Sequence, residues 1–310
     1  MSQSEEPNDL IEENDYQLFQ SDRVHQDSNQ IVPNDCGCGN ASNTPVEKSI
    51  MSQSRIQYIY TIGKIVPRFP RKDIEKEYYQ IMHGLETKGK SDNEIMHSVF
   101  SDENYKYIAY EMCWVFTIES LEIYILRANN REAFEQIVES TNASPSGSDI
   151  NVIIGTKGPL SSPELCNGLI LPIVTVDKVY SIDKDSLLKV IPRKTEEDEK
   201  KFNDTSGELF NRIIQMADNL GATDEHRALN YLSVRYDAIY AHSYKMNLDD
   251  FSLTAIEVVS SRLSGTRKIV DVIFTYRNRK NDFIDKYFTR VDIQEKFPFL
   301  VSPLSIYYNR

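Results

Sequence analysis

The sequence changes character near residue 55, and this change constrains the fold more than any single motif. Residues 1–50 hold ten acidic residues against Arg23 and Lys48, a net charge of −8, and are rich in Asn, Gln and Ser. A segment with so few aromatic residues cannot bury enough apolar surface to offset the entropy lost on ordering. We therefore predict that residues 1–54 are a disordered acidic tail and that residues 55–310 form the folded part.

The net charge, the length of the apolar runs and the first residues of the chain indicate which partners and which compartment to expect. The chain has a net charge of −12, and an acidic tail repels phosphate backbones and anionic lipids, so we expect neither nucleic acid nor membrane as a partner. No apolar run is as long as a membrane span, and the first residues lack the basic and apolar regions of a secretory signal. With four cysteines and no export signal, we expect a reduced, cytoplasmic location.

Residues 55–310 are predicted to adopt an α+β fold, because strand and helix patterns occur in blocks rather than in strict alternation. Runs of β-branched and aromatic residues predict strands at 56–62, 113–126, 150–154, 168–176 and 178–182. Apolar residues at helical spacing predict helices at 73–85 and 130–140, and Ser91 with Glu94 predicts a capping box for another short helix. The segment 141–149 is the clearest linker and marks a potential boundary within the folded part.

The C-terminal half contains the strongest helical patterns. Two long helices are predicted at 206–220 and 224–246, because each has a complete apolar face that must be covered. Three alternating segments, at 248–262, 268–277 and 282–292, then predict antiparallel strands. The expected architecture is thus antiparallel strands packed with two long helices.

Four segments resemble a known family. They are YIYTIGKI (58–65), CNGLILPIVTVDKVYSIDKDSLLKVIP (166–192), GATDEHRALNYLSVRYDAIY (221–240) and the C-terminal strand block. Together they are similar to the domain of unknown function at the end of PatG- and PatA-type proteins of cyanobactin biosynthesis, over roughly residues 55–310. The most specific piece is the run from Arg227 to Tyr231.

The resemblance implies a role beside ribosomally made, modified peptides, with a precursor peptide or a maturation protease as partner, and a homodimer as a further expectation. In that family the domain normally follows a subtilisin-like protease, whereas nothing protease-like precedes it here. The family supplies no agreed catalytic residues. We therefore expect a non-catalytic binding or assembly module.

Arg227, Tyr231 and Arg235 are the predicted peptide- or partner-binding residues. They lie at i, i+4 spacing and therefore share one helix face, where Tyr and Arg make effective interface anchors. The alternative is that these residues pack against the core, as most helical aromatic residues do.

Cys36 and Cys38, in the run CGCG, are the predicted metal ligands. Two such pairs, one from each of two chains, would complete a tetrahedral zinc site between the chains. The alternative is a solvated pair of thiols in a flexible tail. Cys113 and Cys166 lie in apolar surroundings and are expected in the core.

A catalytic reading remains as the alternative function. In it the chain is an unrecognised peptide-modifying enzyme or metal-dependent hydrolase that uses Cys166 and His226. No known cysteine-protease signature surrounds Cys166, and no motif supplies a nucleophile, a base and an oxyanion donor together. The sequence therefore predicts no catalytic residue.

Overall fold

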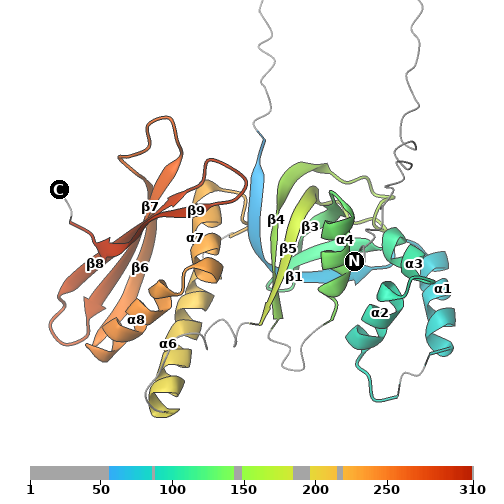
Figure 1. The fold of residues 1–310 in the computed structure, drawn as a ribbon, viewed down its shortest axis with the longest axis horizontal. Coiled ribbons are helices and arrows are strands. Elements are labelled where there is room, and N and C mark those ends of the chain that lie inside the picture. Colours follow the sequence, from blue (N-terminus) through green and yellow to red (C-terminus); the bar gives the residue numbers. More distant parts are fainter. Residues whose placement is uncertain (1–55, 86–87, 143–148, 184–195, 215–218, 309–310) are drawn as a thin grey trace, which may run out of the picture. The chain divides into compact units, whose positions relative to one another are not determined.

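The computed structural model describes residues 56–85, 88–142, 149–183, 196–214 and 219–308 (Figure 1). All described residues belong to one compact unit, Ser54–Arg310. The predicted acidic tail lies outside the described residues, as does most of the predicted linker at 141–149.

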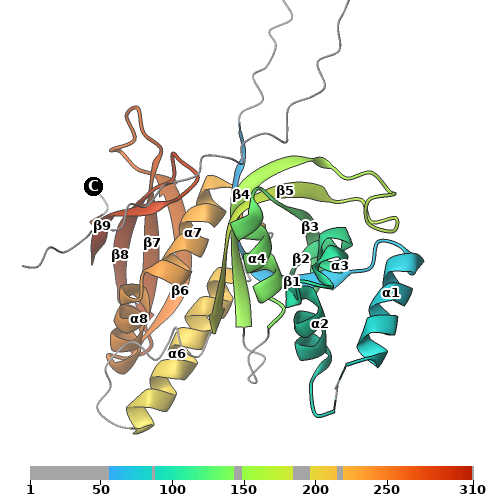
Figure 2. The same cartoon turned by 45° about the vertical axis from the view of Figure 1, so that its right-hand side comes forward.

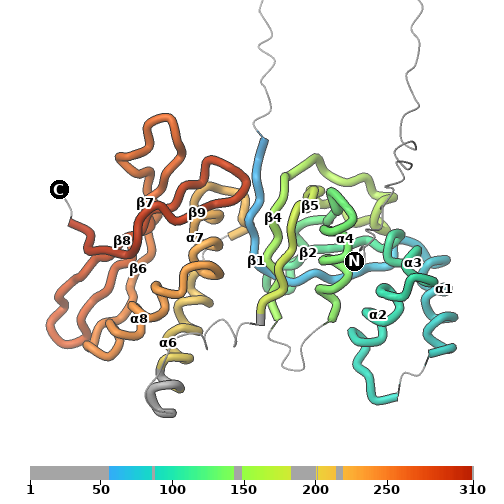
Figure 3. The backbone as a smooth tube through the Cα atoms, viewed as in Figure 1, coloured from blue at the N-terminus to red at the C-terminus, as the bar shows by residue number. Residues whose placement is uncertain are grey.

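A closed barrel of five strands forms the first half of this unit. The strands are β1 (Tyr58–Arg68), β2 (Cys113–Ile118), β3 (Leu121–Ala128), β4 (Asp149–Leu160) and β5 (Pro172–Asp183). Their order around the barrel is β1-β2-β3-β5-β4, and every pair is antiparallel except β3 with β5. β4 and β5 form a long hairpin that residues 161–171 connect (Figure 3). The strands predicted at 168–176 and 178–182 are a single strand, β5.

β1 is longer than the sequence predicts, because it continues through Gly63 and Pro67. A Cβ atom at Gly63 would collide with the carbonyl oxygen of Thr117 on β2. Glycine at this position therefore allows the close approach of two strands in the barrel and does not end the strand.

Four helices accompany the barrel strands: α1 (Lys72–His83), α2 (Asp92–Ser101), α3 (Lys106–Glu111) and α4 (Arg131–Glu139). The capping box predicted for α2 is confirmed, because Ser91 and Glu94 bond each other's backbone amides. Asn130 caps α4 by accepting a hydrogen bond from the Ala133 amide at 2.8 Å. The buried faces of these helices join one core with the barrel, through residues such as Val99, Ile108 and Ile137.

The second half contains helices α6 (Glu196–Ile214), α7 (Asp224–Arg235) and α8 (Ala238–Leu248). They are followed by a four-stranded antiparallel sheet of β6 (Phe251–Ser260), β7 (Ile269–Asn278), β8 (Ile284–Asp292) and β9 (Phe299–Ile306), in that order. The predicted α+β class is confirmed: the described residues contain seven helices and two sheets. The sequence did not predict β9.

The two long helices are not confirmed as predicted. The helix expected at 224–246 is broken into α7 and α8 at Tyr236, whose φ of −130° and ψ of 85° lie outside the helical region. There the Tyr236 hydroxyl oxygen accepts a hydrogen bond from the Leu304 amide on β9, at 2.9 Å. The helix expected at 206–220 corresponds to α6, which the structure describes from Glu196 to Ile214, and residues 215–218 of the predicted range lie outside the described residues. A tertiary contact with an unpredicted strand thus accompanies the break in a continuous helical pattern.

β1 contributes to both cores of the unit, because its side chains alternate between two faces. Ile59 and Ile65 pack with the barrel core and helices α1 to α4. Tyr60 and Ile62 pack instead with α6, α7, α8 and the C-terminal sheet, whose strands lie beside these helices in Figure 2. The Tyr60 amide also donates a hydrogen bond to the Gly221 carbonyl at 2.9 Å. One strand therefore links both halves of the fold.

Candidate functional site

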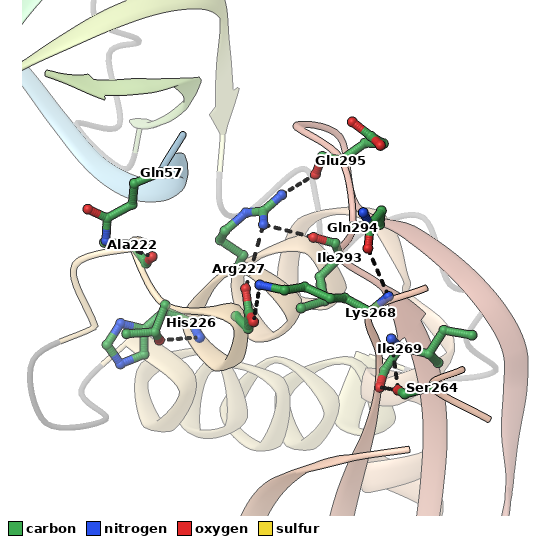
Figure 4. A network of polar contacts seen from close by, with 12 residues as sticks. Gln57, Ala222, His226, Arg227, Ser264, Lys268, Ile269, Ile293, Gln294 and Glu295 are labelled. Carbon is green, nitrogen blue, oxygen red and sulfur yellow. Dashed lines mark hydrogen bonds and ion pairs between the residues drawn. The ribbon is translucent and has the colours of Figure 1, made fainter. Parts of the chain in front are cut away.

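Arg227, the first residue of the predicted binding face, is enclosed within the protein. Its side chain is 4% exposed, and its guanidinium crosses from α7 to the segment that follows β8 (Figure 4). Nη1 donates to the Ile293 carbonyl at 2.9 Å, and Nη2 donates to the carbonyls of Glu295 and Lys296. Arg227 therefore fastens α7 to the turn between β8 and β9.

Electrostatics support this structural role. Burial lowers the pKa of Arg227 from its ordinary value, and the charge of Asp224 on the preceding helical turn opposes the shift. Since arginine remains protonated even after such a shift, the buried positive charge depends on the three backbone carbonyls that surround it. The guanidinium is committed to these contacts and is not presented to a partner.

Tyr231 and Arg235 differ from each other in exposure. The Tyr231 hydroxyl oxygen accepts a hydrogen bond from the Leu300 amide on β9, at 3.1 Å, and the ring meets Tyr60 edge to face at 6.2 Å. Arg235 is exposed, with its guanidinium carbon 4.5 Å from the centre of the Tyr180 ring. Of the three predicted binding residues, only Arg235 is exposed.

Asn230, within the same Arg227–Tyr231 run, is also used inside the protein. Its Nδ2 donates to the Tyr60 carbonyl at 2.9 Å and exchanges hydrogen bonds with Asn219. Asn230 is 1% exposed. The most distinctive run of the sequence therefore joins α7 to β1 on one side and to β9 on the other.

Cys113 and Cys166, expected in the core, are buried there as a disulfide pair with their Cα atoms 5.6 Å apart. They pack with Val115 and Ile125. The alternative assignment of Cys166 as a catalytic nucleophile is contradicted, because its sulfur is bonded to Cys113 and its residue is 1% exposed. His226, the proposed base, lies in the first turn of α7, where its amide donates to the Thr223 hydroxyl at 3.1 Å.

The predicted zinc ligands Cys36 and Cys38 lie outside the described residues. Within the ranges that the structure describes, no three His, Cys, Asp or Glu residues are grouped so as to hold a metal ion. The zinc site between chains stays a prediction.

A cleft of about 620 Å³ lies at one end of the barrel and was not predicted from the sequence. Its walls come from separate elements: the residues before α1, helices α3 and α4, the start of β2, the end of β3, and the segment that joins β4 to β5. The residues that line it include Arg71, Tyr110, Trp114, Arg127, Arg131, Phe134 and Glu164.

The cleft has an aromatic wall with a fixed geometry. The ring of Tyr110 on α3 stacks on Phe134 of α4, with centroids 4.2 Å apart and planes 10° from parallel. Trp114 meets Phe134 edge to face at 6.5 Å, and its indole nitrogen donates to the Ala109 carbonyl at 3.1 Å. Phe134 and Trp114 are buried, whereas Tyr110 is 59% exposed. Tyr110 therefore offers a half-exposed ring whose orientation is held from behind.

Three arginines line the same cleft, and two of them are already paired. Arg71 donates a hydrogen bond to Asp73 at 3.1 Å and thereby lowers the pKa of that carboxyl. Arg131 donates to Glu135 at 2.8 Å and lowers the pKa of Glu135 in the same way. In the described part of the chain, no carboxylate lies within ion-pair distance, 4.0 Å, of Arg127. Among the described residues, Arg127 is thus the cleft arginine that has no acidic partner.

The segment 161–171, which contributes Glu164 and Leu165 to the cleft lining, is tied to the barrel. The Ser161 hydroxyl donates to the Leu169 carbonyl at 3.0 Å and accepts from the Leu171 amide at 3.1 Å. The disulfide joins Cys166 of this segment to the first residue of β2. Glu164 and Leu165, which line the cleft, are therefore held by covalent and hydrogen bonds close to them.

Sequence reasoning missed this cleft because its residues come from segments far apart in the chain. The signals that were available are Tyr110, one of the 18 tyrosines, and Arg127, which directly follows the apolar run of β3. A hollow with apolar walls and a few polar groups is the usual form of a ligand site. This arrangement suits the holding of a ligand.

Comparison with known proteins identifies related sequences and folds. Residues 196–307 match the family model described as PatG C-terminal. A solved structure titled "PatG Domain of Unknown Function" is similar, with a TM-score of 0.67 and 17% identity, over 81% of this chain and 98% of that chain. No curated protein matches the chain. Within the described ranges, no helix has the length and hydropathy that crossing a membrane requires.

Proposed function

From the premise that residues 196–307 match the PatG C-terminal family and that the chain shares the fold of a PatG domain of unknown function, we propose that the protein is a non-catalytic binding module. It holds a peptide segment in the cleft at the barrel end. The predicted resemblance to this domain is confirmed, and the proposal adds a site and a role.

The observation that carries the proposal is the Tyr110 ring, half-exposed in the cleft and stacked on Phe134. An aromatic side chain that is already oriented loses little conformational entropy when a ligand covers it. Such rings commonly act as anchors in protein and peptide recognition. The segment 161–171, which contributes Glu164 and Leu165 to the cleft lining, is braced by hydrogen bonds and by the disulfide, so this part of the site needs little rearrangement to accept a ligand.

The proposed ligand is a precursor peptide of cyanobactin-like maturation, either alone or together with the maturation protease. The link to PatG-type proteins supports this choice of pathway. Assembly with a second copy of the chain, with zinc held between Cys36 and Cys38 of each, remains part of the proposal. The exposed Arg235 is retained as a secondary contact, whereas Arg227 and Tyr231 act within the fold.

Intrinsic fluorescence gives a direct test, because Trp114 is the chain's one tryptophan and lines the cleft. Titration with the precursor peptide from the same gene cluster is expected to change Trp114 emission in a saturable way. Tyr110→Ala is expected to weaken binding roughly tenfold or more. Tyr79→Ala is the matched control, because Tyr79 is 44% exposed and does not line the cleft.

Two results would contradict the proposal. Equal affinity in the wild type and Tyr110→Ala would exclude the cleft as the site. Conversion of the peptide by the purified protein, detected by mass spectrometry, would overturn the non-catalytic role.

A further inference from the structure

We propose that the outer edge of β6 is a second binding surface, which adds an extended peptide to the C-terminal sheet as a further, antiparallel strand. The peptide alternates apolar residues with a basic residue that lies opposite Glu257. This inference goes beyond the proposed function, because the edge belongs to the other half of the fold and shares no residue from 255 to 260 with the cleft.

The two edges of the C-terminal sheet differ in how their backbone groups are used. Among the described strands the order is β6-β7-β8-β9, so β6 and β9 each have one side without a neighbouring strand. On β9, the Leu300 amide donates to the Tyr231 hydroxyl at 3.1 Å. The Leu304 amide donates to the hydroxyl of Tyr236, the C-cap residue of α7, at 2.9 Å. Side chains from α7 and its cap thus occupy amides of β9, as natural sheets protect an edge by covering it.

β6 directs alternate backbone groups away from the sheet. The Ser261 amide donates to the Ile269 carbonyl at 2.9 Å, and the residues of an antiparallel strand point alternately to its two sides. The amides and carbonyls of Ile256, Val258 and Ser260 therefore point away from β7. Within the ranges that the structure describes, no hydrogen bond reaches them. An extended main chain is the partner that fits such a row of alternating donors and acceptors.

The open edge, residues 256–260, has a defined start and no protective residue. Before it, the pairing of β6 with β7 is irregular between Leu253 and Ala255, and the Leu253 carbonyl accepts a hydrogen bond from Arg212 of α6. Helix α6 therefore occupies the beginning of β6. The residues of the open edge, IEVVS, include neither the proline nor the lysine by which exposed edges are commonly protected.

The side chains on the two faces of the open edge specify the peptide. Ile256 and Val258 are half-buried at the margin of the core that β6 shares with α6, α7 and α8. Apolar residues of an added strand would cover these two side chains and extend that core. On the other face, Val259 is 42% exposed and Glu257 is exposed. Because neighbours on one face of a sheet contact in pairs, both faces contribute to the choice of peptide.

Glu257 sets the sign of the charge. Its ion pair with Lys286 of β8 spans 4.0 Å and leaves the carboxylate half-exposed. In an added strand, the residue opposite Glu257 has its Cβ atom about 5 Å away, where an opposite charge is favourable and a like charge is not. A second copy of β6 does not supply that charge, because FSLTAIEVVS contains no basic residue. The occupant that fits is a peptide that combines apolar residues with a base.

Four acetylated and amidated peptides test the pairing with the full-length protein. The first is Thr-Val-Val-Lys-Val-Thr, and the second has Glu in place of Lys. The third is the first peptide N-methylated at its third and fifth residues, whose amides face β6. The fourth is N-methylated at the second and fourth residues, whose amides face away. The first peptide is expected to bind roughly threefold more tightly than the second, roughly tenfold more tightly than the third, and as tightly as the fourth.

Amide hydrogen exchange resolved by NMR gives the readout at each residue. In the free protein, the amides of Ile256, Val258 and Ser260 are expected to exchange quickly. Those of Glu257 and Val259 exchange slowly, because they lie in the ladder with β7. Saturation with the first peptide is expected to slow the three edge amides roughly tenfold or more and to leave the other two unchanged.

Variants at two exposed positions locate the site. Ser260→Pro removes one edge-directed amide and leaves the bonds to β7 in place, since proline is tolerated in an edge strand where its nitrogen faces solvent. Binding of the first peptide is expected to weaken roughly fivefold. Ser260→Ala is the matched control, because it keeps the amide, and it is expected to bind like the wild type. Glu257→Gln is expected to remove the preference for Lys over Glu, and calorimetry checks that each variant is folded.

The outcomes separate this inference from the proposed function. Slow exchange of the edge amides in the free protein would overturn it, and protection that disappears on dilution would identify a second copy as the occupant instead. Equal binding of the third and fourth peptides would overturn pairing through the main chain, and equal binding of the first two would overturn the choice of a basic residue. Binding that persists in Ser260→Pro and is lost in Tyr110→Ala would place the peptide in the cleft and overturn the edge site. Failure of the precursor peptide to change Trp114 emission would overturn only the proposed function.

Discussion

Replacing Arg227 by alanine tests most directly whether this residue belongs to the fold or to a binding surface. The change removes the donors to the Ile293 carbonyl, which is buried, and to the Glu295 and Lys296 carbonyls, which are partly buried. A hydrogen bond to a charged group contributes about 1.5–3 kcal/mol. Water can replace the two partly buried bonds in part, and removal of a buried charge recovers some desolvation cost.

The net loss expected for Arg227→Ala is therefore about 3 kcal/mol in the free energy of unfolding. For a domain of this size, such a loss corresponds to a decrease of roughly 6–12 °C in Tm. Urea unfolding followed by Trp114 emission measures the free energy, and calorimetry measures Tm. Arg227→Lys is expected to lose less, because an ammonium can still donate to one or two of the carbonyls.

The refuting result is a specific one. If Arg227→Ala unfolds at the wild-type temperature and loses affinity for the precursor peptide, Arg227 is a surface anchor and the structural role is wrong. Tyr231→Phe is the variant against which the loss of stability is compared, because it removes only the hydroxyl that accepts a hydrogen bond from the Leu300 amide. That variant is expected to lose about 1 kcal/mol.

Three further predictions follow from other contacts. Replacing Cys113 and Cys166 together by alanine is expected to lower the free energy of unfolding by about 4 kcal/mol, since the disulfide closes a loop with a sequence separation of 53; non-reducing peptide mapping of the wild type checks the bond itself, and unchanged stability would contradict the estimate. Burial lowers the pKa of His242, with the charge of Lys245 acting in the same direction and that of Asp285 opposing it. The unfolded chain therefore binds this proton more tightly, and stability decreases as the pH falls through the ordinary histidine pKa of about 6.5. In urea titrations, His242→Phe should lose less stability than the wild type between about pH 7 and about pH 5, and an equal loss in both would refute the assignment. Limited proteolysis is expected to remove the residues before 56 and leave 56–310 together, whereas separation of two halves at 141–149 would show two independent domains.

The sequence predicted the elements that depend on local signals. The capping box of Ser91 and Glu94 formed as expected, because both partners lie within one helical turn. The helix at 130–140 also formed, with Asn130 as its cap. Local chemistry of this kind needs no knowledge of the rest of the fold.

Elements that depend on distant contacts were predicted less well. The pattern at 224–246 is helical throughout, yet the chain leaves the helix at Tyr236, whose hydroxyl meets β9. β9 itself escaped prediction because Phe299 and Val301 are apolar at exposed positions, Ser302 is polar at a partly buried position, and Pro303 lies inside the strand. The break in the helix at Tyr236 could therefore not be predicted without first predicting β9.

The residues of the candidate site were also hard to predict, because their positions depend on contacts between distant parts of the chain. A helix face of arginine and tyrosine suggested a binding surface, but spacing alone does not show whether a face points to solvent or to the core. Arg227 points inward, and the cleft instead gathers Tyr110, Arg127 and Glu164 from elements that are distant in the chain. Only the barrel closure brings them together.

The dual packing of β1 has a consequence for how this protein can be divided. The region matched by the family model begins at residue 196, but Tyr60 and Ile62, from far earlier in the chain, fill the core of that region. Gly221 approaches β1 so closely that a Cβ atom there would collide with the Tyr60 carbonyl. A gene fragment that starts at residue 196 would therefore encode an incomplete core with an exposed apolar face. Such a fragment is expected to aggregate on expression. The region that the family model matches is therefore smaller than the part of the chain that folds as one unit.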